Sequence, residues 1–243
     1  MGSRLLGECI VNFGVISLFP DMFKALVECG VVSKAFKRKI INIKVWNLRD
    51  FAFDKHKTVD DRPYGGESGM ILKPEPLKRA ILEAKNYFKD AVVIYLSPQG
   101  VPLQQDHVQS FCEYKSIIFV CGRYEGIDER IVKKYIDLQV SIGDYVVSGG
   151  ELPAMVLIDV ISRSIPSVLG NNDSYNNDSF SGSTGGLKGH HYTRPQDFDG
   201  MVVPDVLLSG NHKQIQEWRD QNSIEATRLC RPDLLVKKNT SSN

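Results

Sequence analysis

The chain has 243 residues, which suffices for one large domain or two modest ones. Hydrophobic residues make up 42% and charged residues 24%, which excludes a wholly disordered, collagen-like or disulfide-scaffold protein. The 30 Lys and Arg residues against 29 Asp and Glu leave a net charge of +1. This balance excludes a uniformly basic nucleic-acid coat protein but allows a local basic patch.

The five cysteines and five histidines lack the spacing of metal ligands. No two cysteines form C-x-x-C, and His190 and His191 are adjacent. We therefore expect reduced thiols in a cytoplasmic protein, and no metal site. No run of 18 apolar residues occurs and the first residues lack a signal-peptide core, so we expect no membrane segment.

The N-terminal two thirds of the chain alternate short apolar runs with stretches of helical spacing. The expected strands are residues 15–19, 40–46, 91–96, 117–121 and 138–142. The expected helices are residues 21–30, 76–87, 108–112, 128–135 and 152–164, the first of them ended by Gly30. Unbroken apolar runs such as AVVIYL (91–96) are typical of strands buried on both faces. The alternation predicts an α/β domain with a mostly parallel sheet.

The composition changes near residue 170. All but four of residues 171–189 are Asn, Asp, Ser, Thr or Gly, so this stretch buries too little apolar surface to order itself. We expect a ligand-binding domain over 1–169, a flexible linker over 170–189 that orders on binding, and a small helical domain over 190–243. Its two expected helices are residues 211–221 and 223–229, the first capped by the turn at 209–211.

Glycine-containing loops follow three of the expected buried strands. They are LSPQG (96–100), CGRYEG (121–126) and SIGDYVVSGGELP (141–153). Ligands of open α/β sheets bind beyond the carboxyl ends of strands, and glycine lets the backbone approach them closely. Neither G-x-x-x-x-G-K-[ST] nor G-x-G-x-x-G after the first strand is present, which excludes the common phosphate sites. A nucleoside-like ligand with little phosphate fits better. Any one of these loops alone is better explained as an ordinary turn, and it is the three together that indicate a ligand.

One stretch of the chain is strongly basic. Residues 34–44 (KAFKRKIINIK) contain five basic residues and no acidic one. Such a stretch suits contacts to RNA phosphates, and a solvated helix face would have the same composition.

Together, these loops and other segments resemble the bacterial tRNA (guanine-N1)-methyltransferases of the SPOUT superfamily. The matching stretches are ISLFPDMF (16–23), DDRPYGG (60–66), LSPQG (96–100), CGRYEGIDER (121–130), SIGDYVVSGGELPAMVLIDVISR (141–163), DSF (178–180), HYTRP (191–195) and LLSGNHKQIQEWR (207–219). The chain departs from the family pattern at Glu67, where a further glycine is usual, and at His190, where proline is usual.

The resemblance implies a SPOUT fold, in which the C-terminal part of the sheet domain forms a deep trefoil knot. It also implies a homodimer with the active site between subunits, and S-adenosylmethionine bound in a bent form by the three loops. The expected cofactor-binding residues are Leu96, Ser97, Pro98, Gly100, Gly122, Tyr124, Glu125, Ile142, Gly143, Asp144, Tyr145, Val146, Val147, Gly149 and Pro153. The resemblance also implies a requirement for magnesium, but no residue in this sequence indicates a magnesium site.

The reaction implied by the resemblance is methylation of N1 of the guanosine 3′-adjacent to the tRNA anticodon (guanosine 37). Guanine N1 carries a proton, so a general base removes it as the methyl group arrives, and a cation stabilises the charge at O6. The match assigns the base to Asp178 and the cation to Arg163. Without the resemblance, Asp178 is better explained as a loop aspartate that caps a helix, and Arg163 can be explained as an i,i+4 ion-pair partner of Asp159.

Contacts to tRNA are expected from the basic stretch and from the C-terminal domain. The expected tRNA-binding residues are Lys37, Arg38, Lys39, Tyr192, Arg194, His212 and Arg219. Among them, Tyr192 has the ring to stack on an unpaired base. Two alternatives stay open: a SPOUT RNA 2′-O-methyltransferase, which would not need Asp178, and a non-catalytic RNA-binding protein that keeps the fold.

Overall fold

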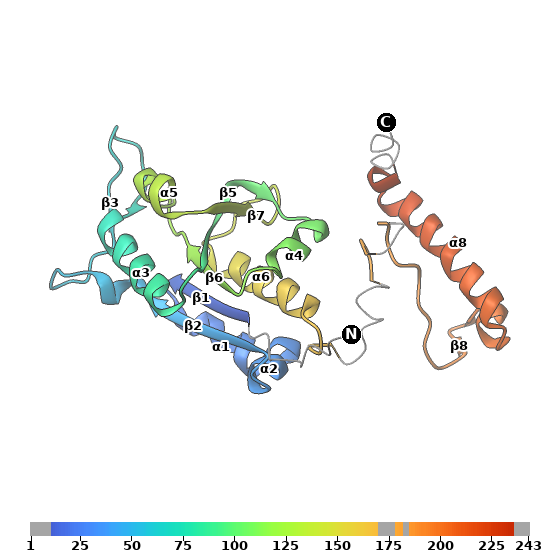
Figure 1. The fold of residues 1–243 in the computed structure, drawn as a ribbon. Helices are drawn as coiled ribbons and strands as arrows, with labels where there is room; N and C mark the ends of the chain where they lie inside the picture. Colours follow the sequence, from blue (N-terminus) through green and yellow to red (C-terminus); the bar gives the residue numbers. More distant parts are fainter. Residues whose placement is uncertain (1–10, 170–177, 182–184, 236–243) are drawn as a thin grey trace, which may run out of the picture. The chain divides into compact units, whose positions relative to one another are not determined.

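The computed structural model describes residues 11–169, 178–181 and 185–235 (Figure 1). The chain divides into two compact units, residues 1–170 and 171–243, and each is described by itself. The expected flexible linker falls partly on 170–177 and 182–184, which lie outside the described residues. Among the described helices, none combines the length and the apolar character needed to cross a bilayer.

The first unit alternates strands and helices, as the sequence pattern predicts. In chain order its elements are β1 (Val11–Ser17), η1 (Pro20–Phe23), α1 (Lys24–Glu28), α2 (Gly30–Lys37), β2 (Ile41–Asn47), η2 (Leu48–Phe51), β3 (Asp60–Asp61), β4 (Ile71–Leu72), α3 (Pro74–Tyr87), β5 (Val92–Pro102), α4 (Gln105–Phe111), β6 (Ser116–Cys121), α5 (Glu129–Tyr135), β7 (Leu138–Ser141) and α6 (Glu151–Ser164).

Five of these strands form one sheet in the order β2-β1-β6-β5-β7, and every pairing is parallel. The expected α/β class with a parallel sheet is confirmed. Because the strands run in one direction, their carboxyl ends meet at a single edge of the sheet. The loops that follow β6 and β7 therefore start from the same edge. The expected first loop, residues 96–100, lies within β5 instead of after it, at an irregularity where the register against β7 shifts between Leu96 and Val101.

Helices cover both faces of the sheet (Figure 1). Residues of α1, α2, α4 and α6 share one apolar cluster with one face, and residues of α3 and α5 share a second cluster with the other. The central strand β6 supplies both, because successive side chains of a strand point to opposite faces. Ile117 and Phe119 lie in the first cluster, and Ile118 and Val120 in the second.

The helical segment at 21–30 differs from expectation. It consists of η1 and the short α1, and Gly30 begins α2 instead of ending the helical region. The extended Cys29 (φ −126°, ψ 153°) and the positive φ of Gly30 (+77°) turn the chain between α1 and α2. The glycine therefore marks a junction between two helices.

The second unit contains β8 (Asp197–Phe198), β9 (Met201–Val202), η3 (Asp205–Leu208) and the 19-residue α8 (His212–Cys230). The expectation of two short helices at 211–221 and 223–229 is wrong. Asn222 and Ser223 have the composition of a helix break, but their side chains bond to a neighbouring segment instead. Asn222 Oδ1 accepts from the His190 amide, and Ser223 Oγ donates to the Leu187 carbonyl at 2.6 Å. Asn211 caps α8 as predicted, accepting from the Gln214 amide at 3.3 Å.

Candidate functional site

A pocket of about 410 Å³ lies at the carboxyl ends of β6 and β7, beside the irregular stretch of β5. We call it the three-loop pocket, since residues 95–99, 122–127 and 140–150 supply most of its lining. The structure brings together the expected cofactor-binding residues Leu96, Ser97, Pro98, Gly122, Tyr124, Glu125, Ile142, Gly143, Tyr145, Val146, Val147, Gly149 and Pro153. Two of the expected residues, Gly100 and Asp144, do not line it.

Gly100 has a structural position instead. It lies within β5, where the register against β7 shifts between Leu96 and Val101. A Cβ atom on Gly100 would overlap the backbone of Gln139 and Val140. Glycine at this position allows β5 and β7 to approach closely, while Asp144 is exposed to solvent.

The second and third loops are joined directly through their backbones. The Gly150 amide donates to the Gly122 carbonyl at 2.8 Å, and Arg123 and Gly149 form an isolated antiparallel bridge. A Cβ atom on Gly150 would lie 2.7 Å from the Cys121 Cα atom, so a side chain there would force the loops apart. The two glycines 149 and 150 therefore set the spacing of two pocket walls.

A buried ion pair lies beneath the same loops. Arg123 Nε donates to Glu151 Oε2 at 2.9 Å, and the Glu151 side chain is 0% exposed. The other oxygen, Oε1, accepts from Ser17 Oγ at 2.7 Å, and Arg123 Nη1 donates to the Ser148 carbonyl at 3.1 Å. Sequence reasoning missed this pair. The available signal was a glutamate opening the otherwise apolar first turns of α6.

The loop after β3 supports the pocket from another side. The Glu125 amide donates to the Met70 carbonyl and the Leu72 amide to the Gly126 carbonyl, both at 3.0 Å. The side chain of Glu125 packs on Gly69, where a Cβ atom would lie 2.6 Å from Glu125 Cγ. The glycine-rich segment around residue 69 is thus shaped by its contact with the second loop.

Two buried titratable groups at this edge are held neutral. Burial raises the pKa of the Tyr95 phenol, against the lowering effect of its hydrogen bond with Ser97. Burial also raises the pKa of the Cys121 thiol well above its usual range, and the nearby Glu151 adds to the shift. Neither group is ionised at neutral pH, so neither serves there as a general base or as a thiolate nucleophile.

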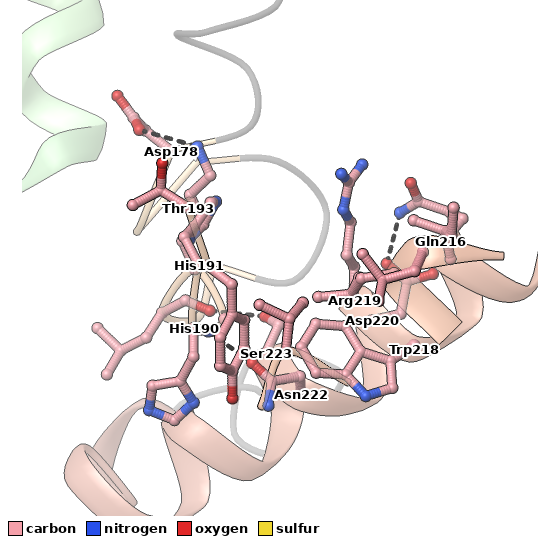
Figure 2. Close-up of a pocket in the computed structure, with 18 of the residues that line it drawn as sticks. Asp178, His190, His191, Thr193, Gln216, Trp218, Arg219, Asp220, Asn222 and Ser223 are labelled. Carbon is pink, nitrogen blue, oxygen red and sulfur yellow. Dashed lines mark hydrogen bonds and ion pairs between the residues drawn. The ribbon is translucent and has the colours of Figure 1, made fainter. Parts of the chain in front are cut away.

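The second unit has its own cavity, of about 980 Å³, between residues 186–196 and α8 (Figure 2). Its lining includes the expected tRNA-binding residues Tyr192, Arg194 and Arg219, but not His212, the first residue of α8. The ring of Tyr192 lies 6.2 Å from that of Trp218 at 57°. Trp218, which sequence reasoning did not assign, therefore presents a second aromatic face to the cavity.

The two expected catalytic residues belong to different units. Asp178 lines the cavity of the second unit and pairs with Lys188, at 3.6 Å between Oδ1 and Nζ (Figure 2). Arg163 is half-buried in the last turn of α6, in the first unit. Over the described ranges, no three His, Cys, Asp or Glu side chains gather as a metal ion would require.

The basic stretch lies at the edge of the sheet away from the three-loop pocket. Lys37 ends α2, and Arg38 and Lys39 lead into β2 at its amino end, whereas the pocket lies at the carboxyl ends of the strands. Arg38 Nη1 donates to the Ser167 carbonyl at 2.8 Å. Within this unit, the structure does not bring the three basic residues to the pocket.

Comparisons with known proteins agree with this geometry. The family model described as tRNA (Guanine-1)-methyltransferase TrmD matches residues 11–237. A Histophilus somni (strain 2336) protein named tRNA (guanine-N(1)-)-methyltransferase is 55% identical over 223 residues, covering 91% of this chain and 90% of that protein. A protein of the same name from Tolumonas auensis is 56% identical over 223 residues, covering 91% of this chain and 89% of that protein.

A solved structure is also similar. The crystal structure of tRNA (m1G37) methyltransferase from Aquifex aeolicus superposes with a TM-score of 0.76 at 37% identity, covering 93% of this chain and 95% of that chain. The fold is accordingly that of the SPOUT methyltransferases, and the trefoil knot stays a prediction. From its family match, its relatives and its fold, the chain belongs to the tRNA (guanine-1)-methyltransferase TrmD family.

Proposed function

We propose that this protein transfers a methyl group from S-adenosylmethionine to N1 of the guanosine 3′-adjacent to the tRNA anticodon (guanosine 37). The observation that carries the proposal is the three-loop pocket, built at the carboxyl ends of parallel strands in a chain of the TrmD family. Relatives at 55% and 56% identity over most of this chain carry the name of that activity.

The chemistry of the lining fits S-adenosylmethionine. Its charged members are Arg123, Glu125 and Glu129, and the guanidinium of Arg123 is paired with Glu151. A polyphosphate would meet two carboxylates, whereas the sulfonium and ammonium groups of S-adenosylmethionine are cationic. Loop amides and apolar side chains such as Leu96 suit an adenosine group, and the pocket volume is in the range of small-molecule sites.

The chain's own residues then have distinct roles at the base. When bound, S-adenosylmethionine supplies a methyl group already activated on sulfur. In our proposal the carboxylate of Asp178 takes the N1 proton as the methyl group arrives, because the N1 lone pair is otherwise unavailable. The guanidinium of Arg163 stabilises the negative charge that develops at O6. The Asp178 side chain is 38% exposed, and this supports the role because an RNA base can reach the carboxylate.

The cavity of the second unit supports binding of the anticodon loop. Its aromatic faces, Tyr192 and Trp218, suit stacking on unpaired bases, and Arg194 and Arg219 suit phosphates. A guanine that is methylated on N1 has to leave its stack, which favours a loop over a duplex. A tRNA substrate also makes the cytoplasm the expected place of action.

We also propose a homodimer with the active site between subunits. Leu152 and Val156, one turn apart on α6, are exposed large apolar side chains, and Phe19 is a third in the same unit. An i,i+4 apolar pair on a helix surface supports packing against a partner. Sedimentation at micromolar concentration should give the mass of two chains, and a monomer that methylates tRNA would contradict the shared site.

Incubation of an unmodified tRNA transcript with labelled S-adenosylmethionine, followed by nucleoside mass spectrometry, tests the activity. We expect 1-methylguanosine. A 2′-O-methylated nucleoside would favour the ribose-modifying alternative, and no product from folded, tRNA-binding protein would favour the non-catalytic one.

A further inference from the structure

The Arg123–Glu151 pair lies where the ends of three strands meet. Ser17 ends β1, Arg123 follows β6, and Ser148 and Glu151 lie between β7 and the first turn of α6. Hydrogen bonds of 2.7 to 3.1 Å connect all four residues through the carboxylate and the guanidinium. The pair thus connects segments that are far apart in the sequence and adjacent at the pocket.

Other contacts fix the guanidinium in one place. It lies 4.4 Å from the centroid of the Phe19 ring, and Nη2 approaches Met22 Sδ at 3.8 Å. The Arg123 side chain is only 17% exposed. Burying two charges is costly, so such a pair is a weak source of stability and is best explained by the specific geometry that it imposes.

We propose that Arg123 and Glu151 are positioning residues that hold the second and third loops at the spacing the cofactor requires. This inference rests on the proposed function. The side chain of Arg123 donates a hydrogen bond to the Ser148 carbonyl, and its backbone forms a β-bridge with Gly149. One residue therefore fixes the third loop at two points. The next residue in the second loop, Tyr124, lines the pocket and has a positive φ of 60°. Loss of the pair would release both pocket walls.

Two variants separate positioning from simple stabilisation. Arg123→Lys keeps the charge but lacks the planar guanidinium, whose separate N–H groups donate to Glu151 and to Ser148 at the same time. The double variant Arg123→Met/Glu151→Leu removes both buried charges, and apolar replacement of a whole buried pair generally preserves stability. Arg130→Met serves as the matched control, because Arg130 also pairs with a carboxylate, that of Asp128, but is exposed and does not line the pocket.

The first measurement is the Kd of S-adenosylhomocysteine, by titration calorimetry, alongside the Tm. We expect the Kd of both pair variants to rise about tenfold or more, equivalent to about 1.4 kcal/mol, while the double variant keeps a Tm near that of the parent. Arg130→Met should bind like the parent. A purely structural pair predicts that affinity recovers with the Tm, and such a recovery would overturn the proposal, as would an unchanged Kd in Arg123→Lys.

The second measurement, hydrogen–deuterium exchange of the ligand-free protein, does not depend on the cofactor. Amides of residues 142–150 should exchange faster in Arg123→Lys than in the parent or in Arg130→Met. Unchanged exchange would refute the positioning role even where the parent methylates tRNA. Faster exchange in a protein that neither binds S-adenosylhomocysteine nor methylates tRNA would instead show that the loops are held by the pair and that the proposed function is wrong.

Discussion

At the scale of single residues, the proposed chemistry depends on a carboxylate and a guanidinium that come from different units. Asp178 lies beside Lys188 in the second unit, and Arg163 lies on α6 in the first. The three-loop pocket, where we propose that S-adenosylmethionine binds, is built within the first unit alone. Binding of the cofactor and removal of the proton should therefore respond to different substitutions.

Substitution of Asp178 by asparagine tests this separation. Asp178→Asn keeps the shape but removes the base, so we expect kcat to fall by about 100-fold or more. The Kd of S-adenosylhomocysteine should be unchanged, because Asp178 does not line the three-loop pocket. Single-turnover methylation and titration calorimetry measure the two effects. Asp205→Asn, at an exposed aspartate of the same unit, is the control, and equal turnover in both variants would exclude Asp178 as the base.

At the scale of secondary-structure elements, α5 depends on a charged cap. Asp128 accepts from the Arg130 amide at 2.9 Å at the start of the helix and also pairs with the Arg130 guanidinium. The hydrogen bond and charge of Arg130 lower the pKa of Asp128. A lowered pKa in the folded state means that the stabilisation is present at neutral pH and disappears as the pH falls through that pKa.

We therefore expect Asp128→Ala to lower the free energy of unfolding by about 1 kcal/mol at pH 7, the usual worth of an N-cap. The difference from the parent should shrink as the pH falls below about 4, where the aspartate of the unfolded chain is protonated. Urea unfolding at a series of pH values measures it. A difference that grows toward acid would contradict the assigned sign.

The end of α2 carries a correctable strain. Lys39 has a φ of 59°, and its amide donates to the Phe36 carbonyl just after the helix, at a position where glycine is favoured. Lys39→Gly should raise the free energy of unfolding by about 1 kcal/mol, because a left-handed backbone is costly for other residues. Lys34→Gly, at an exposed position inside α2, should instead lower it by about 1 kcal/mol. Thermal unfolding of both variants checks the opposite signs.

At the scale of the whole molecule, the near-neutral net charge conceals local basic surfaces. Arg219 lines the cavity of the second unit, and we propose that it contacts a tRNA phosphate. Arg219→Gln should raise the KM for tRNA and reduce the salt slope of tRNA binding by about one. The KM for S-adenosylmethionine should not change. Lys24→Gln, on α1 and paired with Asp21, is the control, and an equal effect there would indicate diffuse electrostatics.

Much of the fold and of the pocket follows from the sequence, because buried parallel strands are read from unbroken apolar runs. The β6 run predicts a central strand with both faces covered, and the three glycine-containing segments meet at one pocket, although the first of them lies within β5. Local patterns do not reveal contacts between distant segments. Arg123 and Glu151 are 28 positions apart in the sequence, and Gly100 packs against the backbone of β7. Asn222 accepts a hydrogen bond from the distant His190 amide and does not break α8.

Methyl transfer to two matched tRNA transcripts tests the proposed activity most directly. One transcript carries guanosine 3′-adjacent to the anticodon, and the other carries adenosine there and is otherwise identical. With labelled S-adenosylmethionine, label should enter the first transcript only and be recovered as 1-methylguanosine. Label in both transcripts, or in neither while the protein is folded and binds tRNA, would contradict N1 methylation of that guanosine.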